Sequence, residues 1–171
     1  TNLELSIFMI EEMIKNSSKE FVSDIENKTF LEPCLGIGSF VFAYLINIEK
    51  LNLKKSQIKK IIDNIYVCEI NNVAINEYKK LFTQFVYTFF NIELTEDYFN
   101  GRIANGLLYN MNVEDFKYID IKNIFPKIMS KGGFDIIATN PPYKNLKAEK
   151  NKYKNIKEYQ KDKKLYEMIS E

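Results

Sequence analysis

The tetrad Asn140-Pro141-Pro142-Tyr143 has the clearest potential for chemistry in this sequence. Its two prolines fix the backbone and remove two N–H donors, which leaves carbonyl oxygens free to accept hydrogen bonds. The Asn140 side chain adds another acceptor. A planar amino group has two N–H donors, so these two kinds of acceptor can hold both hydrogens while the nitrogen lone pair faces an electrophile. The Tyr143 ring offers a face on which a base flipped out of a nucleic acid can stack.

A second group of residues surrounds Gly36 and Gly38, between an apolar run and a helical pattern. Glycines at such a place let the backbone pass close to a ligand, with a helix N-terminus beyond them. A plain tight turn is the alternative, and the third glycine of the dinucleotide fingerprint is absent. Glu32, just before the turn, suits a cationic group better than a pyrophosphate. These residues favour a sulfonium amino acid over NAD as the ligand.

Glu69 follows another apolar run, Ile65 to Cys68. An acidic residue at this place in dinucleotide-binding folds accepts hydrogen bonds from ribose hydroxyls. It lies further from the glycines than the usual distance of about 20 residues, and an inserted helix over 56–64 would explain the difference. Ile70 beside it could pack against an adenine ring. The alternative is an exposed acid at the end of a strand.

Strands and helices that alternate along the chain must position these residues. The pattern of 3–15 places Leu3, Ile7, Ile10 and Ile14 on one helical face, and 134–139 is apolar on both faces, as in a central parallel strand. No β-hairpin signal appears, so we expect an α/β fold with a doubly wound, mostly parallel sheet that binds ligands at the carboxyl ends of its strands. Strands are predicted at 29–32, 65–69, 102–105 and 134–139, and helices at 3–15, 19–26, 39–53, 56–63 with Ser56 as cap, from Asn71 or Asn72 to about 90, and within 114–131 with a break near Pro126.

Composition excludes several kinds of chemistry. The chain has no histidine, so a serine–histidine triad is unavailable, and the two cysteines have no metal-ligand spacing, so no metal site is expected. No apolar run approaches the roughly 18–20 residues that span a bilayer, and no leader opens the chain, which favours a cytoplasmic setting. Residues 144–171 carry 9 lysines against 5 acids. This segment either contacts phosphates or is a solvated loop.

These motifs together resemble the N6-adenine DNA methyltransferases of the gamma arrangement from restriction–modification systems, in particular those that fuse modification and restriction in one polypeptide. Residues 31–40 (LEPCLGIGSF) resemble the first cofactor motif, acid-Pro-x-x-Gly-x-Gly-x-Phe, and 140–143 match the catalytic motif. Residues 1–9 resemble an N-terminal motif that usually reads Thr-Pro, with Asn2 in place of the proline. The resemblance implies a Rossmann-like class I methyltransferase fold, S-adenosyl-L-methionine as cofactor and double-stranded DNA as substrate.

The resemblance also assigns roles to individual residues. Asn105 stands where the family usually has an aspartate that touches the cofactor adenine. Cys34 follows a proline, as does the nucleophile of cytosine-C5 methyltransferases, but it lies in the glycine turn and is therefore predicted to be a wall of the cofactor pocket. The expected catalytic residues are Asn140, Pro141, Pro142 and Tyr143, and the expected cofactor contacts are Thr1, Glu32, Pro33, Cys34, Gly36, Gly38, Phe40, Glu69, Ile70 and Asn105.

The same resemblance predicts the domain organisation. Residues 1–143 form the cofactor-binding and catalytic core, and 144–171 form a lysine-rich loop and the start of the next helix, because Lys164-Leu165-Tyr166 resembles the start of the next motif. We expect a sheet truncated after about the fourth strand, a piece inactive alone, and DNA contacts from a missing recognition domain and the 144–164 segment. A fused or associated endonuclease is a further expected partner. The alternatives are methylation of RNA or of a release-factor glutamine amide, or a fragment that only binds cofactor.

Overall fold

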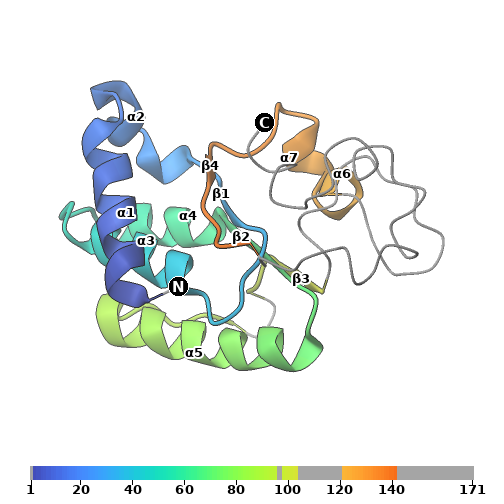
Figure 1. Ribbon diagram of the computed structural model, residues 1–171. Coiled ribbons are helices and arrows are strands. Elements are labelled where there is room, and N and C mark those ends of the chain that lie inside the picture. Colours follow the sequence, from blue (N-terminus) through green and yellow to red (C-terminus); the bar gives the residue numbers. More distant parts are fainter. Residues whose placement is uncertain (1, 96–97, 104–120, 142–171) are drawn as a thin grey trace.

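The computed structural model describes residues 2–95, 98–103 and 121–141 (Figure 1). Four predicted site residues therefore lie outside the described part: Thr1, Asn105, Pro142 and Tyr143. The predicted lysine-rich segment 144–171 lies outside it as well.

Helices and strands alternate along the described chain, as predicted. The strands are β1 (Phe30–Glu32), β2 (Ile65–Glu69), β3 (Gly101–Ile103) and β4 (Ile136–Ile137). The helices are α1 (Leu3–Asn16), α2 (Lys19–Ser23), the 3-10 turn η1 (Ile25–Asn27), α3 (Ser39–Glu49), α4 (Lys55–Asp63), α5 (Asn72–Phe90), α6 (Ile121–Ile124) and α7 (Pro126–Met129). In the described residues no helix is long and apolar enough to cross a bilayer.

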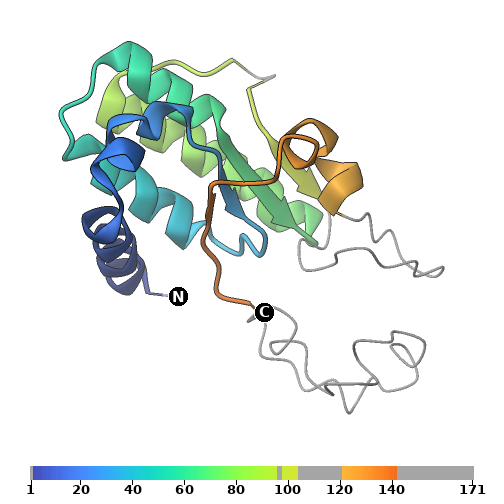
Figure 2. The ribbon, with the colours of Figure 1, turned by 90° about the horizontal axis from the view of Figure 1, so that it is seen from above.

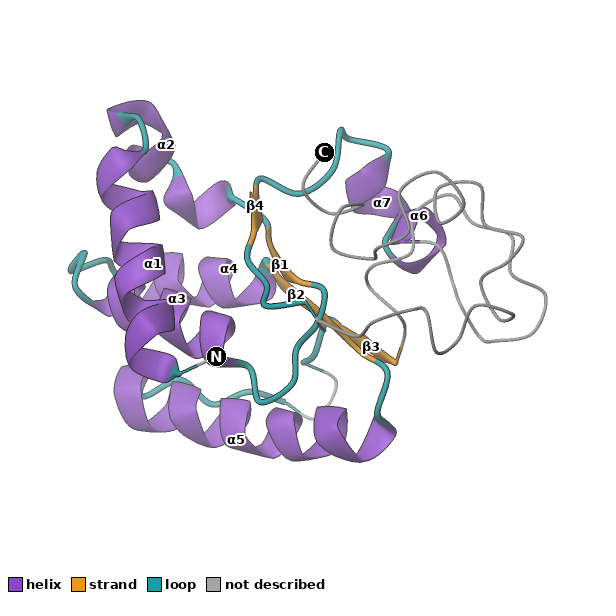
Figure 3. Ribbon diagram, in the orientation of Figure 1, coloured by secondary structure: helices purple, strands orange, loops and turns teal. Residues whose placement is uncertain are grey.

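The four strands form one parallel sheet in the order β3-β2-β1-β4 (Figure 3). Phe30 of β1 pairs with Ile65 of β2 on one side and with Ile136 of β4 on the other. The chain therefore steps outward from β1 to β3 and then returns to the opposite side of β1. The pair β1 and β4 is a topological switch point, which is where open parallel sheets bind ligands.

Apolar residues cover both faces of the sheet. The larger cluster joins Phe30, Val67 and Ile136 of the sheet to residues of α3 and α5, such as Tyr44 and Tyr78. On the other face a smaller cluster joins Leu31 and Cys68 to α6 and α7 through Phe125. Figures 1 and 2 show this division, with α6 and α7 across the sheet from α1 and α3. The helices of the larger cluster cover one face because α3 and α5 are the crossovers that join β1 to β2 and β2 to β3.

Three sequence predictions need correction. The run 134–139 is not a strand buried on both faces: β4 spans only Ile136–Ile137, lies at the edge of the described sheet, and leaves Ile137 61% exposed. Ser56 is not a cap, because α4 begins at Lys55, and the side chain of Gln57 accepts the Lys54 N–H at 3.0 Å. The helix predicted for 39–53 ends earlier, at Glu49.

Hydrogen bonds of Asp135, just before β4, link this strand to the start of β1. Its carboxylate Oδ2 accepts hydrogen bonds from the N–H of Thr29 at 2.8 Å and from the Thr29 hydroxyl at 2.7 Å. The Ile136 N–H donates to the Thr29 carbonyl at 2.9 Å, and the Ala138 N–H donates to the Leu31 carbonyl at 3.1 Å. These bonds bring Asn140, two residues further on, to the carboxyl edge of the sheet.

Candidate active site

Residues predicted to bind or react follow three neighbouring strands. The glycine turn follows β1, Glu69 ends β2, and Asn140 follows β4. Because the strands are parallel and adjacent, their carboxyl ends open at one edge of the sheet. Residues that are far apart in the chain are thereby gathered on the same side of the molecule.

The turn after β1 depends on two glycines with positive φ, 54° at Gly36 and 80° at Gly38. Residues other than glycine rarely adopt these angles. The Gly38 N–H donates to the Leu35 carbonyl at 2.8 Å, and the Leu35 N–H donates to the Cys68 carbonyl of β2 at 2.9 Å. A Cβ atom at Gly36 would meet nothing within 4 Å, so the backbone there is open to an approaching ligand.

Glu32 lies beneath this turn and is only 2% exposed. Its Oε2 accepts a hydrogen bond from the Val41 N–H at 3.1 Å, and the Phe40 N–H contributes a further bond. Gly38 stands at the N-cap position of α3 and has no side chain to cap the helix, so the carboxyl of Glu32 serves the first turn instead. Burial raises the pKa of Glu32 to about 8, although the backbone bonds oppose the shift.

The contacts of Glu32 differ from those that the sequence predicts. We predicted that Glu32 faces a cationic group of the ligand, whereas the described contacts of its carboxyl go to the backbone of α3. Phe40, another predicted contact, is 3% exposed and belongs to the larger core cluster. Pro33 is buried as well. Direct contacts between these three residues and a cofactor stay predictions.

Glu69 joins the two turns that border the site. Its Oε2 accepts the Gly36 N–H at 2.9 Å, and its Oε1 accepts the Asn71 N–H at 2.8 Å. Asn71 in turn caps α5, because its side chain accepts the N–H of Val73 at 2.9 Å. Glu69 is half-buried, so its oxygens remain within reach of further donors such as hydroxyl groups. Ile70 beside it is 64% exposed and offers an apolar surface.

Cys34 stands between the glycine turn and the segment that leads to Asn140. Burial raises the pKa of its thiol to about 11, with the neighbouring Thr139 side chain acting in the opposite direction. A thiol with such a pKa is protonated at neutral pH and is a poor nucleophile. Its environment therefore does not suit covalent catalysis, and its place in the wall of the cofactor pocket stays a prediction. Asn140 is exposed and Pro141 is half-buried.

Two residues near the site were not predicted. Tyr78 of α5 lies against Gly38, since a Cβ at Gly38 would come 2.3 Å from its Cε2 atom. Nothing in the sequence distinguishes Tyr78 from an ordinary apolar residue of an amphipathic helix. The Thr139 hydroxyl is buried beside the Cys34 thiol, directly before Asn140. Its place at a strand end was the only available signal.

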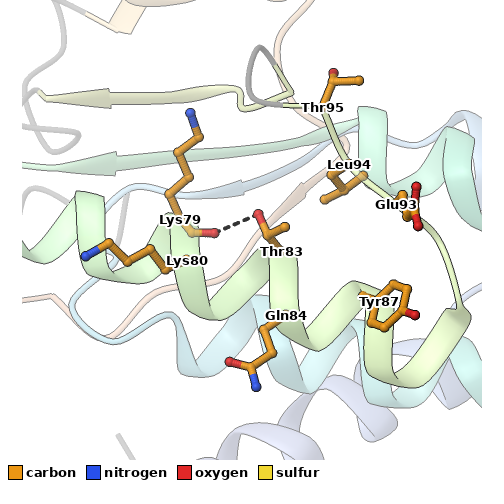
Figure 4. A pocket seen from close by; sticks show the side chains of 8 residues that line it. All are labelled: Lys79, Lys80, Thr83, Gln84, Tyr87, Glu93, Leu94 and Thr95. Atoms are coloured by element: carbon orange, nitrogen blue, oxygen red, sulfur yellow. Dashed lines mark hydrogen bonds between the residues drawn. The ribbon is translucent and has the colours of Figure 1, made fainter.

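A hollow of about 660 Å³ lies elsewhere, along α5 and the segment that follows it (Figure 4). None of the residues that line it is a predicted site residue. They include Lys79, Thr83 and Tyr87 of α5, and Glu93 to Thr95 beyond the helix. The hollow is open and contains none of the predicted residues at the strand ends, so we do not assign the active site to it.

The fold and the gathered strand ends define an α/β protein with a ligand site at the carboxyl edge of a parallel sheet. Residues 47–170 match the sequence model of the family described as Eco57I restriction-modification methylase. The match covers most of the chain, and the protein belongs to this family of restriction–modification methyltransferases. The matched region includes Glu69 and Asn140, whereas the glycine turn precedes it. Searches of curated proteins and of solved structures found no significant match.

Proposed function

We propose that this protein is an S-adenosyl-L-methionine-dependent DNA methyltransferase of the gamma arrangement that methylates N6 of adenine within a restriction–modification system. One observation carries the proposal: the glycine turn, Glu69 and the Asn140-Pro141 segment follow three adjacent parallel strands. The family match supports methyl transfer and a restriction–modification context. The strand order supports a Rossmann-like class I methyltransferase fold.

The residues at this edge fit the proposed cofactor. Gly36 is exposed with open space around it, which suits the methionine part of the cofactor, and Glu69 offers carboxylate oxygens for ribose hydroxyls. The exposed side chain of Ile70 suits the adenine ring. When bound, S-adenosyl-L-methionine supplies a methyl group attached to a sulfonium, which is an electrophile. We do not assign the cofactor a direct bond to Glu32, because that carboxyl is buried against α3.

The chain's own residues then have defined tasks. The side-chain oxygen of Asn140 accepts a hydrogen bond from one N–H of the adenine amino group, and the Pro141 carbonyl accepts a hydrogen bond from the other N–H. These bonds would leave the nitrogen lone pair free to form the new N–C bond to the methyl group as the methyl–sulfur bond breaks and leaves a neutral thioether, and the surplus proton would leave to solvent. By the family resemblance, Tyr143 stacks on the flipped base. Contacts to double-stranded DNA are assigned to a recognition domain and to the 144–164 segment.

The substrate test uses the full-length protein and three acceptors: double-stranded DNA, RNA and a peptide-release factor. We expect transfer of the labelled methyl group to DNA, with N6-methyladenine as the product. Transfer to RNA or to the protein factor alone would overturn the choice of substrate.

Substitution of Asn140 separates catalysis from binding. Asn140→Ala should reduce the rate of methyl transfer at least a hundredfold, because it removes one acceptor for the amino group, while cofactor affinity measured by calorimetry stays within about threefold of wild type. Asn72→Ala, which changes another exposed asparagine at the same edge, is the matched control and should retain the wild-type rate. Equal loss of cofactor affinity and rate in Asn140→Ala would contradict the catalytic role.

A further inference from the structure

We propose that Tyr78 is a positioning residue for methyl transfer: its ring supports the Gly36–Gly38 turn from inside the protein and so sets the backbone on which the cofactor rests. This inference rests on the proposed function, since it concerns the same cofactor site. It assigns a role to a residue of α5 that lies outside every motif of the sequence.

The first observation is the close approach of Tyr78 to Gly38. A Cβ atom at Gly38 would lie 2.3 Å from Cε2 and 2.6 Å from Cδ2 of Tyr78, both far inside van der Waals contact. At Gly36 a Cβ atom would meet nothing within 4 Å. The two glycines therefore have different reasons to be glycine. Both have positive φ, but only Gly38 also lacks space, and the ring of Tyr78 occupies that space.

The second observation is that the Tyr78 ring is itself held in place. It is 2% exposed and packs against three other rings, with centroid distances of 5.6 Å to Phe42, 5.6 Å to Phe82 and 5.8 Å to Phe99. These rings come from α3, from α5 and from the segment before β3. Because two other elements and a neighbouring ring of its own helix enclose the ring, it cannot move away from the turn without disturbing them.

The third observation concerns how Tyr78 is related to Glu69 and to Glu32. Tyr78 belongs to α5, whose N-cap Asn71 is bonded to Glu69. On the inner side, burial raises the pKa of the Tyr78 phenol well above its usual value, and the charge of Glu32 acts in the same direction. One helix thus carries the ring that meets the glycine turn and is hydrogen-bonded through its N-cap to the proposed ribose-binding acid, Glu69.

The hydroxyl of Tyr78 is buried and has no hydrogen-bond partner among the residues that the structure describes. A buried hydroxyl in this state does not stabilise the fold. The proposed role therefore belongs to the ring, and Tyr78→Phe should leave cofactor affinity within about twofold of wild type.

The test measures the dissociation constant for S-adenosyl-L-methionine by calorimetry on the full-length protein. Tyr78→Leu should weaken binding at least tenfold while kcat at saturating cofactor stays within about threefold. Tyr44→Leu is the matched control, because Tyr44 is also a buried tyrosine whose hydroxyl has no partner among the described residues. Its ring stacks on Phe30 of the core. It should destabilise the fold similarly and leave the dissociation constant within about twofold.

A double-mutant cycle measures the coupling between two substitutions in cofactor affinity, which a general packing defect would not produce. Gly38→Ala should weaken cofactor binding in both backgrounds, because its positive φ does not suit alanine, but it should do so more strongly in the wild type than in Tyr78→Leu, where the ring that the new Cβ meets is gone. The effects of Gly36→Ala and Tyr78→Leu should instead add, since no atom of Tyr78 lies near Gly36. If Tyr78→Leu does not fold, Phe42→Leu removes one of the rings that hold Tyr78, and about threefold weaker binding is then expected.

The outcomes separate this inference from the proposed function. Absence of cofactor binding by the wild-type protein would overturn both. A wild type that binds, together with equal effects of Tyr78→Leu and Tyr44→Leu, would overturn only the role of Tyr78. Additive effects of Gly38→Ala and Tyr78→Leu would do the same, and so would unchanged binding in Phe42→Leu where that variant is used.

Discussion

Glu32 and Glu69 each end a parallel strand at the same edge of the sheet, yet their carboxyl groups lie in opposite environments. Glu32 is buried beneath the glycine turn and bonds to the first turn of α3. Glu69 lies at the rim, where it accepts the N–H groups of Gly36 and Asn71 and remains half-exposed. The sequence predicts a direct cofactor contact for both acids, Glu32 with a cationic group and Glu69 with the ribose.

The difference assigns the two acids to separate tasks. A carboxyl that is enclosed and serves the backbone of a helix contributes mainly to the folded geometry of the turn. A carboxylate at the rim can exchange or share its bonds with a ligand. Glu32, the inner acid, therefore supports the glycine turn together with Tyr78. Glu69, the outer acid, contacts the cofactor that we propose to bind there. If the two acids have separate tasks, substitutions of Glu32 and of Glu69 should change different properties of the protein.

The largest expected effect is a dependence of stability on pH that comes from Glu32. The folded protein keeps the Glu32 proton until its pKa of about 8, whereas the unfolded chain releases it near 4.5. Between these values the folded state binds more protons, so the free energy of unfolding falls as the pH rises, by up to about 5 kcal/mol from this group. Urea unfolding of wild type and Glu32→Gln at several pH values from 4.5 to 9 measures it.

Glu32→Gln should remove most of this slope, because the amide does not titrate. Glu69→Gln is the control and should keep the wild-type slope. Identical slopes in the wild type and in Glu32→Gln would show that Glu32 is not the enclosed acid described above.

A smaller effect is expected when each acid is truncated at constant pH. Glu32→Ala leaves the Val41 and Phe40 N–H groups without their partner inside the protein, so the free energy of unfolding at pH 7 should fall by about 2–4 kcal/mol. Glu69→Ala removes bonds at the partly solvated rim, where water replaces them, and should lower it by less than about 1 kcal/mol. Equal losses in urea unfolding would remove the distinction between the two acids.

The arrangement of these strand ends could be predicted from the sequence to a useful extent. The apolar runs before Glu32 and Glu69 became β1 and β2, and the helix expected to open at Asn71 or Asn72 became α5, with Asn71 as its cap. These predictions succeeded because burial of a parallel strand and capping of a helix leave strong local signals. The direction of Glu32 left no such signal, since all three residues of β1 are buried and no alternation marks an inward side.

The fourth strand shows where local patterns mislead. Phe134 contributed to the apolar run that predicted a long strand, but it lies before β4 and packs in the smaller cluster, with its ring 5.4 Å from that of Tyr66 and 5.5 Å from that of Phe125. The support that Tyr78 gives to Gly38 was also invisible, because it joins residues 40 positions apart. Contacts of this kind depend on the packing of α5 against the turn.

The last prediction concerns cofactor binding by Glu69, the outer acid, and its expected change in free energy is the smallest. Glu69→Ala should raise the dissociation constant for S-adenosyl-L-methionine at least tenfold, about 1.4 kcal/mol, because the ribose hydroxyls lose their charged acceptor. Glu32→Gln should change it less than threefold, since the amide oxygen can still accept the N–H groups of α3. Calorimetric titration of the full-length variants compares the two. A stronger effect of Glu32→Gln would reverse the roles and place the cofactor against the inner acid, with Glu69 serving only to join the two turns.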